Sequence, residues 1–153
     1  MYFENYLKEF GDKKIKVFVD MDGTIVDYVV GDTTNFDGRR PLMHNIKNLE
    51  NVYNNMPNVE FYILSAARLH SGLEQKLNWL EKYTPFIKKE NRIILIREDN
   101  DFKLSKELKA AYLEKFKNDD SIIIVVDDDR QVIDEIKEKN PNVIVLKDTA
   151  LVD

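Results

Sequence analysis

Residues 15–24 read IKVFVDMDGT, and this stretch decides the fold. Its first half is a short apolar run rich in β-branched residues, which is typical of a strand buried on both faces of a parallel sheet. Its second half places two carboxylates, Asp20 and Asp22, directly after the strand, and Gly23 then favours a tight turn. We therefore expect this strand to deliver both acids to the sheet edge where α/β folds bind ligands.

Four more apolar runs of strand length follow, at residues 59–64, 92–96, 122–126 and 143–146. Helical periodicity separates them: a helix from Pro41 to about residue 55 with Ile46, Leu49 and Tyr53 on one face, one over 71–83, one capped by Ser105, and one over 130–139. A short leading helix is expected over residues 2–10. This alternation predicts a Rossmann-like three-layer α/β sandwich around a central parallel sheet of about five strands.

Residues 24–40 fit neither the strand nor the helix pattern. We expect a small flap there, with a hairpin that turns at Gly31-Asp32. The interval between Asp20 and the second apolar run leaves no room for a large cap domain once this flap and the helix from Pro41 are placed.

The composition sets the class of protein. The chain has 153 residues, 43% of them apolar and 33% charged, so we expect one globular domain over residues 1–153. It has no cysteine and two histidines, which excludes a disulfide framework, a thiolate zinc site and a multi-histidine metal site. The net charge of −5 gives no global basic footprint for nucleic acid, although a local patch stays open. No stretch has the length of a signal peptide or a membrane span, so we expect a cytoplasmic protein without a membrane partner.

Polar side chains follow two of the other predicted strands. Ser65 comes directly after the second strand, and Asp127 and Asp128 follow the fourth. Because the carboxyl ends of parallel strands meet at one edge, we expect Asp20, Asp22 and Asp127 to lie close together. Such a cluster is repulsive unless a cation compensates it, and Mg²⁺ prefers oxygen ligands of this kind. A lone Asp-Gly is usually only a turn, but an Asp-x-Asp at one strand end and an Asp pair at another favour a metal site.

Three segments resemble motifs of the haloacid dehalogenase-like (HAD) hydrolases: residues 20–24, Ser65, and the pair Asp127-Asp128. The resemblance covers roughly residues 14–146. The resemblance implies a Mg²⁺-dependent phosphohydrolase that acts through an aspartyl-phosphate intermediate, with Asp20 as nucleophile and Asp22 as general acid and then base. It implies that Ser65, together with Ala66, binds the phosphoryl group. It also implies Mg²⁺ ligands in the Asp20 carboxylate, the Asp22 backbone carbonyl and Asp127, with Asp128 as a further ligand or a supporting group.

The HAD family also uses a cation, usually lysine, to stabilise the transition state. Three lysines are candidates here. We favour Lys109, on the helix before the fourth strand, because the apolar face of that helix can guide its stem towards the cleft. Lys106 lies one turn earlier on the same helix. Lys76 precedes Trp79, which we expect in the core, in a segment that resembles the deoxyribonucleotidase branch of the family.

The layout resembles the capless phosphatase domain of polynucleotide kinase/3′-phosphatases. The shared elements are Gly38-Arg39 in a short flap, Ser65 with Arg68, and the run 128–130 of two aspartates and an arginine. The resemblance implies an open site for a phosphate monoester such as a nucleotide or a nucleic-acid end, with Arg39 and Arg68 as substrate-binding candidates. The chain departs from that group because Arg68 is one residue further from Ser65 and because its net charge is acidic.

A second class of function stays open, namely a receiver-like or HAD-like phosphate-binding or signalling module without turnover. Receiver domains lack the Asp-Gly-Thr that follows the nucleophile here, and a non-catalytic relative is expected to lose one of the two key aspartates, Asp20 and Asp22. The oligomeric state is not predicted by the sequence.

Overall fold

The structure is a computed structural model that describes residues 2–28, 36–100 and 103–152. Its centre is a five-stranded sheet with the order β3-β2-β1-β4-β5, and every neighbouring pair is parallel. The strands are β1 (Ile15–Val19), β2 (Val59–Ala67), β3 (Arg92–Ile96), β4 (Ile122–Asp127) and β5 (Val143–Lys147).

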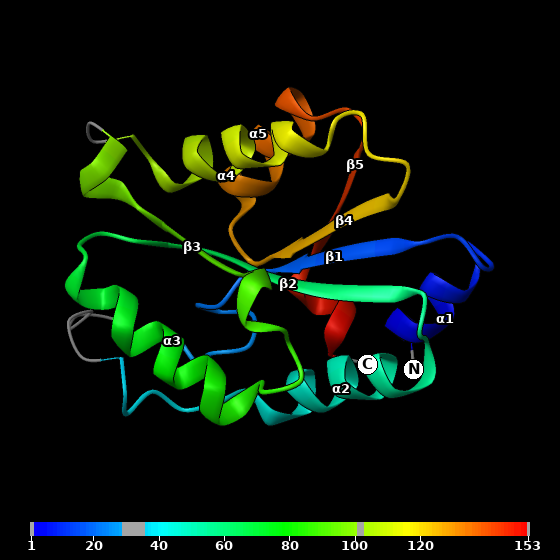
Figure 1. Ribbon diagram of the computed structural model, residues 1–153, viewed down its shortest axis with the longest axis horizontal. Coiled ribbons are helices and arrows are strands. Elements are labelled where there is room, and N and C mark those ends of the chain that lie inside the picture. The colour runs from blue at the N-terminus through cyan, green and yellow to red at the C-terminus, as the bar shows by residue number, and fades with distance from the viewer. Residues whose placement is uncertain (1, 29–35, 101–102, 153) are drawn as a thin grey trace.

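Helices cover both faces of the sheet (Figure 1). One face carries α1 (Tyr2–Lys8), α2 (Met43–Asn55) and α3 (Ser71–Tyr83), and the other carries α4 (Ser105–Leu113) and α5 (Arg130–Lys139). Short 3₁₀ turns complete the chain: η1 (Lys89–Asn91), η2 (Arg97–Asn100), η3 (Glu114–Phe116) and η4 (Asp148–Leu151). The Rossmann-like three-layer sandwich predicted from the sequence is therefore confirmed.

Each face of the sheet has its own apolar core, as alternation along the buried strands requires. Val17 and Val19 of β1 face the core formed with α1, α2 and α3, while Phe18 faces the core formed with α4 and α5. Trp79 is buried in the first of these cores, as predicted. Two well-packed layers thus fix β1 from both sides and hold the position of the residues that follow it.

Several local predictions need correction. Helix α2 begins at Met43 rather than in the turn of Pro41, and Tyr53 is 47% exposed instead of sharing the buried face of Ile46 and Leu49. Ser105 is the first residue of α4 and makes no capping hydrogen bond, because the N-cap position falls on Leu104. Strand β2 continues past Ser65 to Ala67, since β3 pairs with its last five residues.

The expected flap leaves β1 through a tight turn and returns next to it. The amide of Asp27 donates to the Arg40 carbonyl at 2.8 Å, and Val26 forms an antiparallel bridge with Pro41. The two ends of the flap therefore pair with each other. The expected turn at Gly31-Asp32 lies outside the described residues. Within the ranges described, no helix combines the length and the apolar character needed to cross a membrane.

Candidate active site

Two aspartates meet where β1 and β4 end. In the parallel register Val19 lies opposite Val126, and the Asp20 amide donates to the Val126 carbonyl at 3.0 Å. Asp20 and Asp127 consequently follow these residues side by side, and both are buried. The order of the strands therefore creates the carboxylate pair expected from the sequence.

Lys109 of α4 lies between these two aspartates. Its Nζ donates to Asp20 Oδ1 and to Asp127 Oδ2, each at 2.7 Å, and its side chain is buried. Burial alone lowers the pKa of this ammonium, but the two carboxylates outweigh burial and raise it. Lys109 is therefore a permanent cation that offsets part of the carboxylate charge.

Asp128 completes an acidic triad with Asp20 and Asp127. Burial, together with the neighbouring Asp20 and Asp127 carboxylates, raises the pKa of Asp128 to about 8. Burial and Asp20 likewise raise the pKa of Asp127 to about 6, against the opposing effect of Lys109. Burial and the neighbouring carboxylates therefore both disfavour the ionised forms of Asp127 and Asp128.

The triad fits a hard divalent cation. One carboxylate oxygen from each of Asp20, Asp127 and Asp128 lies within 4.8 Å of the others. All three donors are oxygens, which Mg²⁺ prefers, and a cation would relieve the carboxylate repulsion that, with burial, raises the pKa values of Asp127 and Asp128. The three carboxylates that the sequence proposed as metal ligands thus lie together, while the Asp22 carboxylate, expected as the acid and base rather than as a ligand, has other partners.

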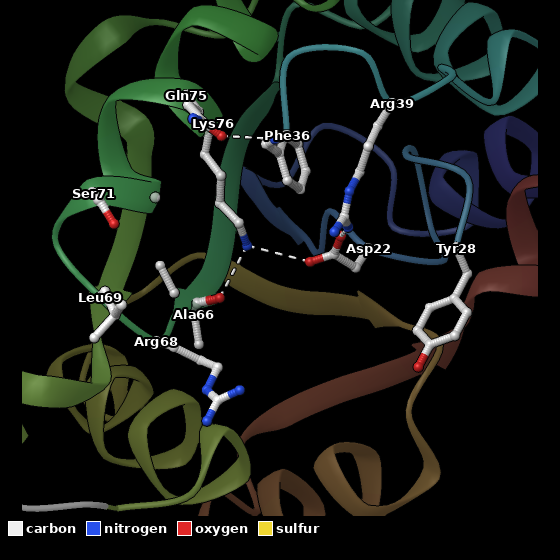
Figure 2. Close-up of a pocket in the computed structure, with 12 residues that line it drawn as sticks. Asp22, Tyr28, Phe36, Arg39, Ala66, Arg68, Leu69, Ser71, Gln75 and Lys76 are labelled. Carbon is white, nitrogen blue, oxygen red and sulfur yellow. Dashed lines mark hydrogen bonds and ion pairs between the residues drawn. The ribbon is translucent and has the colours of Figure 1, made fainter. Parts of the chain in front are cut away.

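Asp22 is held by two cations from different parts of the chain. Arg39 Nη1 donates to Asp22 Oδ1 at 2.7 Å, and Lys76 Nζ donates to Asp22 Oδ2 at 3.3 Å (Figure 2). Both cationic side chains are buried, whereas the Asp22 side chain is 34% exposed. The carboxylate of Asp22 is therefore fixed in place but still open to a ligand.

Helix α3 positions the returning end of the flap. Trp79 Nε1 donates to the Arg39 carbonyl at 2.9 Å, and the Gln75 side chain accepts from the Phe36 amide at 2.7 Å. The Phe36 ring packs edge-on against Trp79, and the Arg39 guanidinium lies over the Phe36 ring. These contacts explain how a loop residue such as Arg39 reaches Asp22. Sequence reasoning did not find them, although the three-residue spacing of Lys76 and Trp79 already placed both on one side of a helix.

Two pockets adjoin at Asp22. The smaller, of about 170 Å³, contains the acidic triad, Lys109 and Ser65. The larger, of about 390 Å³, contains Arg39, Arg68 and Lys76 together with the Tyr28 and Phe36 rings. Asp22, Tyr28 and Ala66 line both pockets. An acidic pocket therefore opens directly into a larger one that is rich in cations and rings.

The remaining candidates are spread over these pockets. Ser65 accepts from Lys76 Nζ at 2.8 Å, and the Ala66 carbonyl accepts from the same nitrogen at 2.9 Å. Arg68 is exposed and extends along the wall of the larger pocket (Figure 2). In the part of the chain that the structure describes, Lys106 makes no ion pair with the acidic cluster, so the three candidate lysines are not equivalent.

The fold is shared with solved phosphatase and RNA-repair structures. A chain in the structure of the Pnkp1/Rnl/Hen1 RNA repair complex matches with a TM-score of 0.68 and 18% identity, over 90% of this chain and 43% of that chain. A second structure of the Pnkp1/Rnl/Hen1 complex gives 0.67 and 20%, over 90% and 46%. The N-terminal part of the protein BF1531 from Bacteroides fragilis, which contains a phosphatase domain and is complexed with Mg, gives 0.58 and 14%, over 92% and 38%.

The chain spans less than half the length of each of these solved chains. At these identities the likeness shows a common fold, which agrees with the HAD-like phosphatase fold that the sequence motifs indicated. No protein-family model matches the sequence, and no curated protein matches it.

Proposed function

We propose that the chain is a HAD-type, Mg²⁺-dependent phosphatase that hydrolyses a phosphate monoester through an aspartyl-phosphate on Asp20. The observation that carries this proposal is the position of Asp22 at the junction of the acidic pocket and the cationic pocket. A phosphoryl group beside Asp20 would have its leaving group beside Asp22. That arrangement suits a nucleophile and a separate acid/base acting on opposite ends of one bond.

Each residue of the acidic pocket has a defined task in this proposal. Asp20 attacks phosphorus, and Lys109 orients its carboxylate through the hydrogen bond to Oδ1. Asp22 protonates the leaving oxygen and then takes a proton from the water that hydrolyses the intermediate. Asp20, Asp127 and Asp128 would hold Mg²⁺, with the Asp22 backbone carbonyl as the further ligand that the family resemblance implies. When bound, the ion would offset the charge of the nucleophile and the phosphate.

We further propose a nucleotide or a nucleic-acid end as the substrate class. The larger pocket supports this because Arg39 and Arg68 suit phosphate oxygens, while the exposed Tyr28 ring offers a stacking surface for a base. Its volume of about 390 Å³ suits a group larger than phosphate alone. The similar chains in RNA repair complexes also favour this class.

A phosphatase screen with Mg²⁺ tests the proposal. It should compare oligonucleotides phosphorylated at the 3′ or the 5′ end with nucleotides, sugar phosphates and phosphopeptides, and should use Asp20→Asn as the inactive control. We expect the natural chain to release phosphate from nucleotidyl substrates and Asp20→Asn to release none. Stoichiometric phosphorylation of Asp20 without turnover would instead favour the receiver-like signalling alternative.

A further inference from the structure

Lys76 is a second buried lysine at this site, and Lys109 does not duplicate its contacts. Lys109 contacts Asp20 and Asp127, whereas Lys76 contacts Ser65, Ala66 and Asp22. The two lysines approach from opposite faces of the sheet, on α4 and on α3 (Figure 1). Their tasks should therefore be different.

The donors of Lys76 are fully engaged. An ammonium has three N–H donors, and Nζ has three acceptors, namely Ser65 Oγ at 2.8 Å, the Ala66 carbonyl at 2.9 Å and Asp22 Oδ2 at 3.3 Å. The Phe36 ring covers another side of Nζ, at 5.2 Å from the ring centre. Lys76 would therefore have to give up one of these contacts before it could donate to a phosphate.

Loss of Lys76 would leave Ser65 without its described hydrogen-bond donor, whereas Asp22 would keep one. Asp22 keeps a second anchor in Arg39, at 2.7 Å. The buried Ser65 hydroxyl instead accepts from Lys76 alone among the described residues, and it lines the acidic pocket. With a lone pair of Oγ engaged by Lys76, the hydroxyl hydrogen must point elsewhere, and the pocket side offers it a phosphoryl oxygen.

We propose that Lys76 is a positioning residue that orients the Ser65 hydroxyl to donate to the phosphoryl group of the ligand. This inference rests on the proposed function for the identity of that ligand. It gives Lys76 a role in phosphate recognition that it exerts through Ser65 and without touching the substrate.

A double-mutant cycle between Lys76 and Ser65 tests the proposal. Ser65→Ala, Lys76→Met and the double variant are compared in two assays with saturating Mg²⁺: turnover of p-nitrophenyl phosphate and calorimetric binding of inorganic phosphate. Lys82→Met, an exposed lysine on the same helix, is the matched control. Because the Ser65 contact is a hydrogen bond to an anion, each single variant should lose roughly 10- to 100-fold in kcat/KM.

The double variant should lose no more than about threefold beyond Ser65→Ala, because the effect of Lys76 passes through Ser65. Losses that multiply in the double variant would overturn the proposal. If Lys76→Met does not fold, Lys76→Gln replaces it, because a neutral amide can still donate a hydrogen bond at this site. Whatever kcat/KM Lys76→Gln loses in the natural background should again be absent in the Ser65→Ala background.

The two assays separate the two proposals. A natural chain that turns over no phosphate monoester, but binds inorganic phosphate with the same coupling, would refute the phosphatase proposal and support the role of Lys76. Turnover of phosphate monoesters with losses that multiply in the double variant would support the phosphatase proposal and refute the role of Lys76. A natural chain that neither binds nor hydrolyses phosphate would refute both.

Discussion

Gly23 and Asp128 approach each other so closely that no side chain fits between them. A Cβ on Gly23 would lie 2.0 Å from Asp128 Oδ2, and the φ angle of Gly23 is +81°, a conformation that residues with a side chain rarely adopt. The turn after β1 thus needs glycine for two independent reasons. This is what allows the carboxylate that follows β4 to lie against the turn that follows β1.

We predict that Gly23→Ala displaces the Asp128 carboxylate and weakens Mg²⁺ binding and turnover together. The left-handed backbone alone should cost about 1–2 kcal/mol of the free energy of unfolding. Gly11→Ala is the matched control, because Gly11 also has a positive φ, of +64°, but nothing lies within 4 Å of its Cβ position. Calorimetric Mg²⁺ titration should show a loss only for Gly23→Ala. Equal behaviour of the two variants would mean that contact with Asp128 has no consequence.

We predict that Asp22→Asn lowers kcat by roughly 10²- to 10⁴-fold, the usual contribution of a general acid and base. The fold should survive, because the amide oxygen can still accept from Arg39, and Lys76 keeps Ser65 and the Ala66 carbonyl as acceptors. Asp27→Asn, in the adjoining flap, is the control, since Asp27 pairs with Arg40 at an exposed site. The rates are to be measured with p-nitrophenyl phosphate and with a nucleotidyl substrate. Full turnover in Asp22→Asn would remove Asp22 from the mechanism.

Saturating Mg²⁺ should stabilise the fold. A cation at a concentration one hundred times its Kd adds about 2.7 kcal/mol, which for a chain of this length raises Tm by roughly 5–10 °C. Differential scanning calorimetry with and without chelator measures this shift. The increase should shrink strongly in Asp127→Asn but persist in Asp134→Asn on the exposed side of α5. An increase that persists in both variants would place the bound cation elsewhere.

The sheet and its acidic edge could be predicted because they follow from local patterns. Five apolar runs indicated five parallel strands, and parallel strands bring their carboxyl ends together, so the proximity of Asp20 and Asp127 needed no knowledge of the packing. Position favoured Lys109 over Lys106 and Lys76, since a helix that crosses back to β4 can direct the lysine stem along its buried face, and the structure places Lys109 against Asp20 and Asp127. The start of α4 was placed less well, since Ser105 is its first residue and the N-cap falls on Leu104, a difference of one residue that local capping preference does not resolve.

The environment of Asp22 could not be predicted in this way. It depends on Arg39, a flap residue whose position is fixed by Trp79 of α3, forty positions further along the chain. The sequence indicated only that Trp79 belongs to the core. Contacts between a loop without periodicity and a distant helix leave no local pattern, and the two cations on Asp22 therefore appear only in the structure.

Without metal, the stability of the protein should fall as pH rises. The pKa of Asp128 is raised to about 8 and that of Asp127 to about 6, whereas both lie near 3.8 in an unfolded chain. Between these values the unfolded chain has lost protons that the folded chain retains, so the free energy of unfolding decreases with pH. Urea titrations in chelator from about pH 5 to pH 8 measure the slope.

The same titrations provide the control for this pH dependence. Asp128→Asn should flatten the slope, because the amide does not titrate. Mg²⁺ should flatten it as well, since a bound cation favours the ionised carboxylates of the folded state. A free energy of unfolding that rises with pH in chelator would contradict the raised pKa values.

Finally, Lys109→Met should destabilise the metal-free protein and abolish most turnover. Removing one member of a buried ion pair typically costs about 3–5 kcal/mol, because the partner charge is left uncompensated. Here Asp20 and Asp127 both lose their cation. The loss should be smaller at low pH, where protonation of Asp127 removes charge from the cluster, and Mg²⁺ should restore part of the stability at high pH.

Lys106→Met, on the same helix but without an ion pair to the cluster in the described residues, should change stability by less than about 0.5 kcal/mol. Urea unfolding of both variants, with chelator and with Mg²⁺, makes the comparison. If Lys106→Met gave the larger loss, the cation that balances this site would have to be reassigned.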